Sequence, residues 1–294
     1  MIIESLQLIT TEDNQQVAVW QVADDHQATY IGQNVLMIHG AFSDKRILLG
    51  IARYLAQQGY HCYIMEWRGH GASPKAKADF NLETVALYDV AATFDYLFNT
   101  LGLSSVHCIT HSGGGMCLTM FLIQHPTYID KVNSISMFAC QAFGAALTPK
   151  RYARVLMGRT MTKALGYLPA KRFGLGSINE SYFTMKQWFN WNLHRNFASS
   201  CIKKDGQLFD YKAQMPKVNA PIYSIAAAGD VFIAPPSGCQ LYLDSYNNRN
   251  NQFREFGVAK GDLDNYNHGR IMMSQNAAKE VWPTVLTWIK AHSG

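Results

Sequence analysis

Several features are scarce in this chain of 294 residues, and each scarcity argues against a class of protein. Charged residues make up only 16% of the chain and hydrophobic residues 48%, which argues against intrinsic disorder. The six cysteines form no C-x-x-C pair, so they fit reduced thiols better than a disulfide framework. Lys and Arg exceed Asp and Glu only by 26 to 21 and form no run of five. No nucleic-acid partner is therefore expected.

Long apolar runs are also missing. The most apolar stretch, residues 113–123, is too short to span a bilayer, so we expect no stable membrane insertion. The first residues include Glu4 and show no basic region followed by an apolar one, so we expect no secretory signal and predict a cytoplasmic protein. A chain of this length buries roughly three-quarters of its extended surface, which predicts a substantial core.

Short apolar runs alternate with helical patterns through the first half of the chain. Such runs are typical of strands buried on both faces. Their alternation with helices predicts right-handed crossovers and a parallel sheet covered on both sides, which is an α/β fold. An antiparallel hairpin is predicted ahead of it. The predicted hairpin strands are 5–10 and 16–22, the buried strands are 34–38, 61–65, 105–109 and 131–138, and the helices are 47–58, 82–98 and 113–125.

This rhythm is interrupted between residues 143 and 215. The segment contains Trp188, Trp191 and several Met and Phe residues without a buried-strand run, so we expect a mainly helical cap insertion. The predicted organisation is an α/β core in two parts, 1–142 and 216–294, with the cap at 143–215 between them. Strands resume at 221–227 and 252–258, and a last helix is expected at 270–291. Pro283 should kink that helix or start a second one, because proline lacks a backbone donor.

The residues that follow the buried strands carry the chemistry, because ligands bind at the carboxyl ends of parallel strands. After the third buried run comes Thr110-His-Ser-Gly-Gly114, which is close to the G-x-S-x-G nucleophile elbow. In that turn the hydroxyl of Ser112 would stand above the sheet. Thr110 departs from the usual glycine. The alternative is an ordinary Ser-Gly-Gly turn at the start of a helix.

An oxyanion hole is predicted beside this serine. His39-Gly-Ala-Phe42 follows the first buried run, where a loop supplies one backbone donor to the hole. The predicted donors are the amide of Gly113 and that of Ala41 or Phe42. His39 itself is expected to position the loop.

Asp230 and His268 complete a candidate catalytic triad. Residues 132–148 contain no carboxylate, so the next strand end, Gly229-Asp230, is the place for the acid. His268 follows the last strand and is the one histidine at a carboxyl edge downstream of that acid. The chain order Ser112, Asp230, His268 is the order found with this elbow.

The chain resembles the α/β-hydrolase superfamily over nearly its whole length. The matching pieces are His39-Gly40, Arg68-Gly-His-Gly71, His111-Ser-Gly-Gly114, Gly229-Asp230 and His268-Gly269. The tail is more loosely similar to serine esterases of the acid-lipase kind, from Tyr266 through Asn276-Ala-Ala-Lys-Glu-Val-Trp282 to Trp288. The resemblance implies a mostly parallel, eight-stranded type of sheet and a carboxylesterase or lipase-like activity that needs no cofactor.

The expected substrate is a small ester with an apolar acyl or aromatic group, because the cap is rich in Met and Trp. Trp188 and Trp191 are the candidate substrate-binding residues. His107 and His111 are four apart on a strand, which is not a metal-binding spacing there, so no metal is expected. A thioesterase, an amidase or peptidase, a C–C hydrolase on the same triad, and a non-catalytic binding protein remain alternatives. The sequence does not indicate an oligomeric state.

Overall fold

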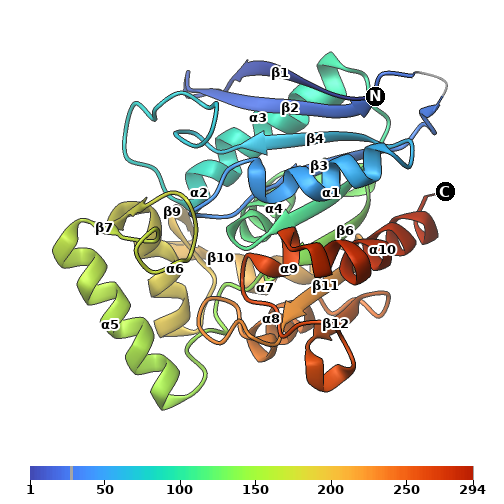
Figure 1. The fold of residues 1–294 in the computed structure, drawn as a ribbon. Coiled ribbons are helices and arrows are strands. Elements are labelled where there is room, and N and C mark those ends of the chain that lie inside the picture. Colours follow the sequence, from blue (N-terminus) through green and yellow to red (C-terminus); the bar gives the residue numbers. More distant parts are fainter. Residues whose placement is uncertain (27–28, 294) are drawn as a thin grey trace.

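An eight-stranded sheet forms the centre of the computed structural model, which describes residues 1–26 and 29–293 (Figure 1). The strand order is β1-β2-β4-β3-β5-β6-β11-β12. β1 and β2 form an antiparallel hairpin, β2 pairs antiparallel with β4, and all later pairs are parallel. The strands are β1 (Ile2–Thr10), β2 (Gln16–Asp24), β3 (Asn34–Ile38), β4 (His61–Glu66), β5 (Val106–His111), β6 (Val132–Phe138), β11 (Ile222–Ala227) and β12 (Gln252–Phe256).

The central strands are the continuous apolar runs of the sequence. Every residue of β3, β5 and β11 is buried, as expected for strands with helices on both faces. The predicted α/β class, the N-terminal hairpin and the parallel sheet are confirmed.

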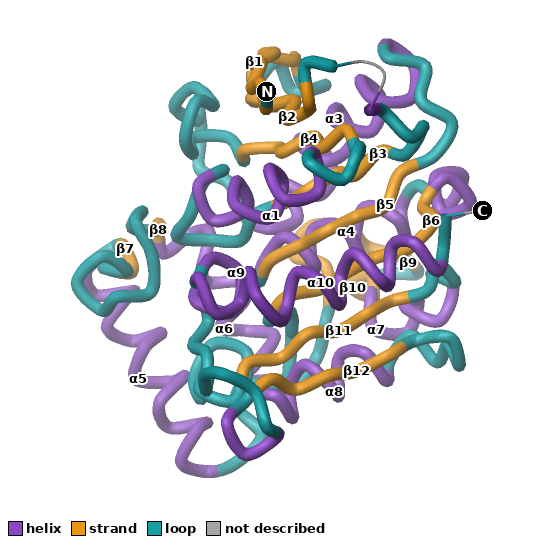
Figure 2. Tube along the Cα trace, turned by 45° about the vertical axis from the view of Figure 1, so that its right-hand side comes forward, coloured by secondary structure: helices purple, strands orange, loops and turns teal. Residues whose placement is uncertain are grey.

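Helices cover both faces of this sheet (Figure 2). Residues of α1, α9 and α10 form the core on one face, and residues of the 82–100 helical run and α4 form the core on the other. The run at 82–100 alternates α and π turns: α2 (Leu82–Thr84), Val85–Val90, α3 (Ala91–Asp95) and Tyr96–Thr100. The remaining helices are α1 (Arg46–Ala56), α4 (Gly113–Gln124), α8 (Pro236–Asp244), α9 (Arg270–Met273) and α10 (Gln275–Ala291).

The C-terminal helix differs from the prediction at Pro283. The break between α9 and α10 falls at Ser274, and Pro283 lies inside α10. Ser274 has extended backbone angles and its side chain accepts a hydrogen bond from the amide of Ala277. This N-cap begins the second helix well before the proline.

Residues 143–215, the inserted segment, leave the sheet between β6 and β11, which pair directly with each other. In Figures 1 and 2 the segment lies beside the sheet, with α5 at its outer edge and both chain termini on the other side of the molecule. Its helices are α5 (Pro149–Leu165), α6 (Tyr182–His194) and α7 (Tyr211–Gln214), and its strands are β7 (Tyr167–Leu168), β8 (Glu180–Ser181), β9 (Ala198–Lys204) and β10 (Gln207–Asp210).

The strand pairs β7–β8 and β9–β10 were not predicted. Only Ser199 of the seven residues of β9 is buried, so the hairpin has no apolar run to mark it in the sequence. The carboxylate of Glu83, in α2, links this region to the core. It accepts hydrogen bonds from Ser199 Oγ at 2.5 Å, from the Ser200 amide at 2.8 Å and from the Tyr211 hydroxyl at 2.8 Å.

Candidate active site

Ser112 lies at a sharp turn between β5 and α4. Its φ and ψ are 51° and −122°, a left-handed conformation that is strained for any residue other than glycine. The loop after β3 packs directly on this turn, because a Cβ atom added to Gly40 would lie 2.6 Å from Ser112 Cβ. A Cβ on Gly114 would lie 2.3 Å from the carbonyl oxygen of Ile38. The glycine spacing around Ser112 therefore serves close backbone packing.

Thr110, the departure from the elbow pattern, is accommodated by a second glycine. Its hydroxyl lies 3.5 Å from Cys140 Sγ in a fully buried position. A Cβ on Gly115 would lie 3.0 Å from Thr110 Oγ1 and 2.6 Å from Cys140 Sγ. Gly115 thus leaves the room that the threonine side chain occupies, and the turn at Ser112 forms beside it.

Asp230 and His268 are joined by a hydrogen bond of 2.5 Å between Oδ2 and Nδ1. The other carboxylate oxygen of Asp230 accepts the amides of Ile233 and Ala234, both at 3.1 Å. Burial would raise the pKa of Asp230, but the His268 imidazole and these two amides outweigh it and hold the pKa below its ordinary value. Asp230 is therefore a buried carboxylate that fixes one ring nitrogen of His268.

The loops that carry these two residues meet at Gly229. Its amide donates to the carbonyl oxygen of Tyr266 at 2.9 Å, and a Cβ on Gly229 would lie 2.5 Å from that oxygen. Only a glycine lets the loop after β11 approach the loop after β12 so closely.

His111 connects His268 to the elbow. Its Nε2–H donates to the carbonyl oxygen of His268 at 2.8 Å, and the two rings lie 4.8 Å apart. Burial lowers the pKa of His111 to about 3, so the ring is neutral. In the sequence His111 belongs to the elbow motif and has no metal-binding spacing; its position next to Ser112 was the one signal of this role.

The Nε2 atom of His268 is buried and has no hydrogen-bond partner among the described residues. Ser112 Oγ also takes part in no hydrogen bond within the part of the chain that the structure describes. A ring nitrogen and a serine hydroxyl are therefore both without a partner at this edge of the sheet. Ser112, Asp230 and His268 are 6%, 4% and 7% exposed, so the site is largely shielded from water.

The loop after β3 is held from two sides. The Trp67 amide donates to His39 Nε2 at 3.1 Å, and His39 Nδ1 then donates to the Gly40 carbonyl oxygen at 2.7 Å. Burial lowers the pKa of His39 to about 3, so it acts as a neutral bridge between two loops, which agrees with its predicted positioning role. From the other side, the Phe42 amide donates to Glu180 Oε1 at 3.3 Å.

Glu180 also pairs with His70, and both side chains are only 3% exposed. Glu180 Oε1 lies 2.6 Å from His70 Nε2, and His70 Nδ1 lies 3.1 Å from the carbonyl oxygen of Arg68. Both partners are acceptors, so His70 donates from both nitrogens as an imidazolium. Burial would lower the pKa of His70, but Glu180 raises it above its ordinary value. Nothing in the sequence marked this pair, whose members lie 110 residues apart.

Two neighbouring cavities lie beside these residues. The first, of about 660 Å³, is lined by Ala41, His111, Asp230 and His268. The second, of about 430 Å³, is lined mostly by apolar side chains from α5, from α6 and from the loops that follow β7 and β11, and Trp188 is one of them. The two cavities share four wall residues: Phe173, Leu175, Phe232 and Ile233.

The two candidate substrate-binding tryptophans have different surroundings. Trp188 is a wall of the apolar cavity. Trp191 borders a separate hollow of the inserted segment. Its Nε1–H donates to the Ala198 carbonyl oxygen at 2.7 Å and its ring packs edge-on against Phe197.

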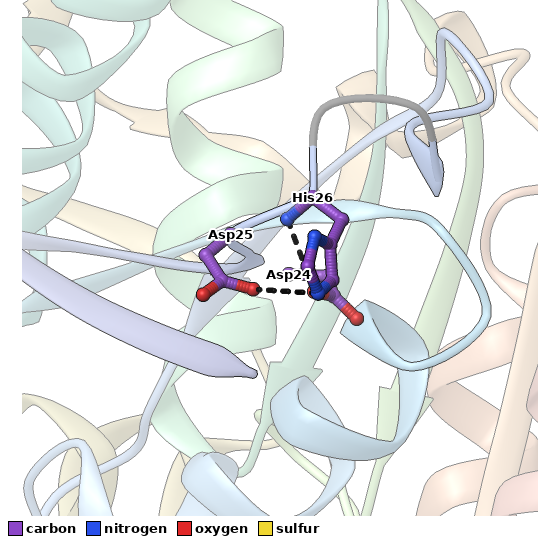
Figure 3. A group of neighbouring side chains, drawn as sticks. All are labelled: Asp24, Asp25 and His26. Carbon is purple, nitrogen blue, oxygen red and sulfur yellow. Dashed lines mark hydrogen bonds and ion pairs between the residues drawn. The ribbon is translucent and has the colours of Figure 1, made fainter.

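One group of possible metal ligands occurs among the described residues, formed by Asp24, Asp25 and His26 (Figure 3). It follows β2, which runs antiparallel to β4, so it lies at the amino ends of the central strands, opposite the candidate site. The α-ammonium group of Met1 pairs with both carboxylates. This cluster therefore has no connection with Ser112.

Among the helices of the described residues, none combines the length and the apolar character that crossing a bilayer requires.

Comparisons with known proteins identify the fold family. The sequence profile of the family described as alpha/beta hydrolase fold matches residues 33–230. Comparison with curated protein sequences gives no match.

Many solved structures share the fold. An esterase from Exiguobacterium antarcticum is 15% identical, with a TM-score of 0.66 over 97% of this chain and 99% of that one. An esterase from Pyrococcus furiosus is also 15% identical, with a TM-score of 0.66 over 100% and 92%. A bacterial membrane phospholipase A is 18% identical, with a TM-score of 0.62 over 98% and 87%. Because the family profile covers more than half of its residues, the chain belongs to the α/β hydrolase fold family.

Proposed function

We propose that the protein is a serine hydrolase that cleaves carboxylic esters through Ser112, His268 and Asp230. The observation that carries this proposal is the buried Asp230–His268 pair with an unpartnered Nε2, which His111 ties to the strained turn of the neighbouring Ser112. Serine is a weak nucleophile without a neighbouring base, and His268 is the base that this arrangement offers.

In the proposed reaction His268 Nε2 takes the proton of Ser112 as Oγ attacks the ester carbonyl. The same imidazolium then protonates the departing alcohol, and a water molecule hydrolyses the acyl-enzyme in a second step. Asp230 fixes the proton on Nδ1 and stabilises the positive charge that forms on the ring.

The oxyanion that develops in each step needs two backbone donors. The Gly113 amide is the first, and its nitrogen lies 3.0 Å from where a Cβ of Gly40 would be. Of the two predicted second donors, Phe42 directs its amide to Glu180, which favours the amide of Ala41.

The substrate is proposed to be an ester with an apolar acyl or aromatic group, placed in the cavity lined by Trp188. Trp191 is left out of this role, because it borders neither of the two cavities beside His268. Esterases among the similar structures support the ester bond. The triad chemistry itself serves thioesters, amides and C–C bonds as well.

Labelling with a fluorophosphonate probe tests the nucleophile directly. We expect one adduct, mapped by mass spectrometry to Ser112, and none in Ser112→Ala. Ser237→Ala, which changes an exposed serine, should label like the wild-type protein. Folded protein that stays unlabelled, or that is labelled elsewhere, would contradict the proposal and favour a binding protein.

A matched panel of substrates tests which type of acyl bond the protein cleaves. The same acyl chain is offered as an ester, a thioester and an anilide at equal concentration. The proposal requires the ester to give the largest kcat/KM; a larger value for either of the others would reassign the activity on the same triad.

A further inference from the structure

The charge of the molecule is unevenly distributed along the chain. Residues 131–179 contain no Asp or Glu, although the whole chain has 21. Seven of its 26 Lys and Arg residues lie between positions 149 and 173, which include α5 and the loop that follows β7. These seven, called the basic set below, are Lys150, Arg151, Arg154, Arg159, Lys163, Lys171 and Arg172.

The basic set is not neutralised by the protein itself. None of its members forms an ion pair within residues 1–26 and 29–293. Five are exposed and two, Arg151 and Arg159, are half-buried. Only Val155 and Thr162 of α5 are buried, so most of the circumference of this helix faces outward, at the outer edge of the molecule in both Figure 1 and Figure 2.

Large apolar side chains are exposed among these cations. Positions 149–173 hold six of them: Tyr152, Leu156, Met157, Leu165, Tyr167 and Phe173. Met157 is 68% exposed and Phe173 52%. Soluble monomers seldom expose apolar groups in such a concentration unless the surface binds something.

This surface continues into the cavities described above. Arg154, Met157 and Phe173 line the apolar cavity, and Phe173 also lines the cavity that reaches His268. Val231 and Met273, which are 54% and 56% exposed, line the cavity that reaches His268. Exposed apolar side chains therefore surround an apolar space that adjoins the cavity lined by His268.

We propose that residues 149–173 dock the protein on an anionic phospholipid surface, so that a lipid-borne ester can pass its acyl chain into the apolar cavity. Lys and Arg side chains would contact the headgroup phosphates while the exposed apolar side chains enter the acyl boundary. Only the passage of a substrate rests on the proposed hydrolase function; the docking itself does not.

The apolar side chains favour a lipid surface over a nucleic acid. A phosphate backbone would satisfy the basic set but would leave Leu156, Met157 and Leu165 without a partner. A bilayer interface satisfies both groups at once. Each Lys or Arg near an anionic bilayer strengthens the attraction to it, so several together hold a protein there without a spanning helix.

Vesicle sedimentation with the full chain tests the docking. We expect the protein to sediment with phosphatidylcholine vesicles that contain phosphatidylglycerol and to stay in solution with pure phosphatidylcholine. At an ionic strength of about 1 M, where the Debye length is about 3 Å, binding should fall at least about tenfold. Phe173→Ser should weaken binding even at low salt, whereas Ile3→Ser, which changes a similarly exposed side chain of β1, should not.

Charge reversal locates the surface. Lys163→Glu with Arg172→Glu should reduce vesicle binding at least about tenfold. The control is Arg249→Glu with Lys290→Glu, which changes the net charge equally; these two exposed residues precede β12 and end α10, beyond the amino ends of the strands. Thermal unfolding of each variant checks that it is folded.

Three results would overturn the inference: no binding to anionic vesicles, equal binding to both vesicle types, or loss of binding only in the control pair. Binding of a single-stranded oligonucleotide without vesicle binding would assign the surface to nucleic acid instead. Vesicle binding and Ser112 labelling are independent readouts, so a failure of docking and a failure of the hydrolase proposal can be told apart.

Discussion

The sheet and the inserted segment are held in place by partly different means. In the sheet, the loops of the candidate triad contact one another through backbone atoms, at Gly40 against the elbow and at Gly229 against Tyr266. The inserted segment has similar backbone contacts, at Gly176 against Phe42 and at Gly144 against Gly238, but it is also attached through two buried carboxylates, Glu83 from the core side and Glu180 from its own. Backbone contacts of this kind leave no room for adjustment. Carboxylate contacts can be weakened in steps and depend on protonation.

The largest loss of activity is expected from a change in the sheet region, at Asp230. Asp230→Asn keeps the shape of the side chain but offers an amide where His268 Nδ1 requires an acceptor, which favours the wrong tautomer. We expect kcat to fall by about 10³–10⁴ with little change in KM. Ester hydrolysis measured beside thermal unfolding checks this, and a loss under tenfold in folded protein would remove Asp230 from the triad.

A single methyl group tests the backbone contacts. Gly229→Ala places Cβ 2.5 Å from the Tyr266 carbonyl oxygen, and we expect a loss of about 3 kcal/mol in the free energy of unfolding, together with most of the activity. Gly269→Ala is the control, because a Cβ there meets nothing within 4 Å, so its change should stay below about 0.5 kcal/mol. If urea unfolding gave both variants the same loss of unfolding free energy, the close contact at Gly229 would not be what holds these loops.

A change at the attachment of the inserted segment should have a smaller effect than the changes in the sheet, but a measurable one. In Glu83→Gln one carboxylate oxygen becomes a donor that faces other donors, so we expect a loss of about 2–3 kcal/mol in stability. KM for an ester should rise more than kcat falls. Glu12→Gln, on the exposed surface, should change neither quantity. A fall in kcat as large as that of Asp230→Asn would show that both regions act as one unit.

The smallest expected effect is a pH dependence. The pKa of His70 is raised in the folded protein, so its ion pair with Glu180 contributes fully below the ordinary value of 6.5 and is lost as the pH rises through the folded value. The melting temperature of Glu180→Gln should therefore lie furthest below that of the wild type near pH 6, and the gap should narrow toward pH 9. A gap that widens with pH would contradict the assigned charge state.

The sequence predicted the sheet well, because most of its central strands are apolar runs, and Ser112 and Asp230 each follow one of them. Ser112, Asp230 and His268 were chosen from their places after the strands together with the elbow pattern and the chain order, and the structure brings Asp230 and His268 into contact. The tight turn at Ser112 was predicted in spite of Thr110.

The inserted segment was predicted less well, since its order depends on contacts between residues far apart in the chain. Glu180 contacts His70 and Phe42 only in the folded chain, and no local sequence pattern predicts that a carboxylate will be buried. The hairpin β9–β10 lacks a buried face. The basic residues form no long run, so the sequence did not mark them as a group. The stretch of residues 131–179, which contains no Asp or Glu, was the feature that could have indicated the basic set.

The close contact between positions 110, 115 and 140 restricts the order in which this elbow can be redesigned. A side chain larger than glycine at position 115 would meet Thr110 Oγ1 at 3.0 Å and Cys140 Sγ at 2.6 Å, so it is tolerable only after both neighbours have been made smaller. A library that varies one position at a time would lose every variant with a larger residue at position 115, because the single substitution clashes before positions 110 and 140 have changed. Directed evolution of this turn therefore has to vary the three positions together.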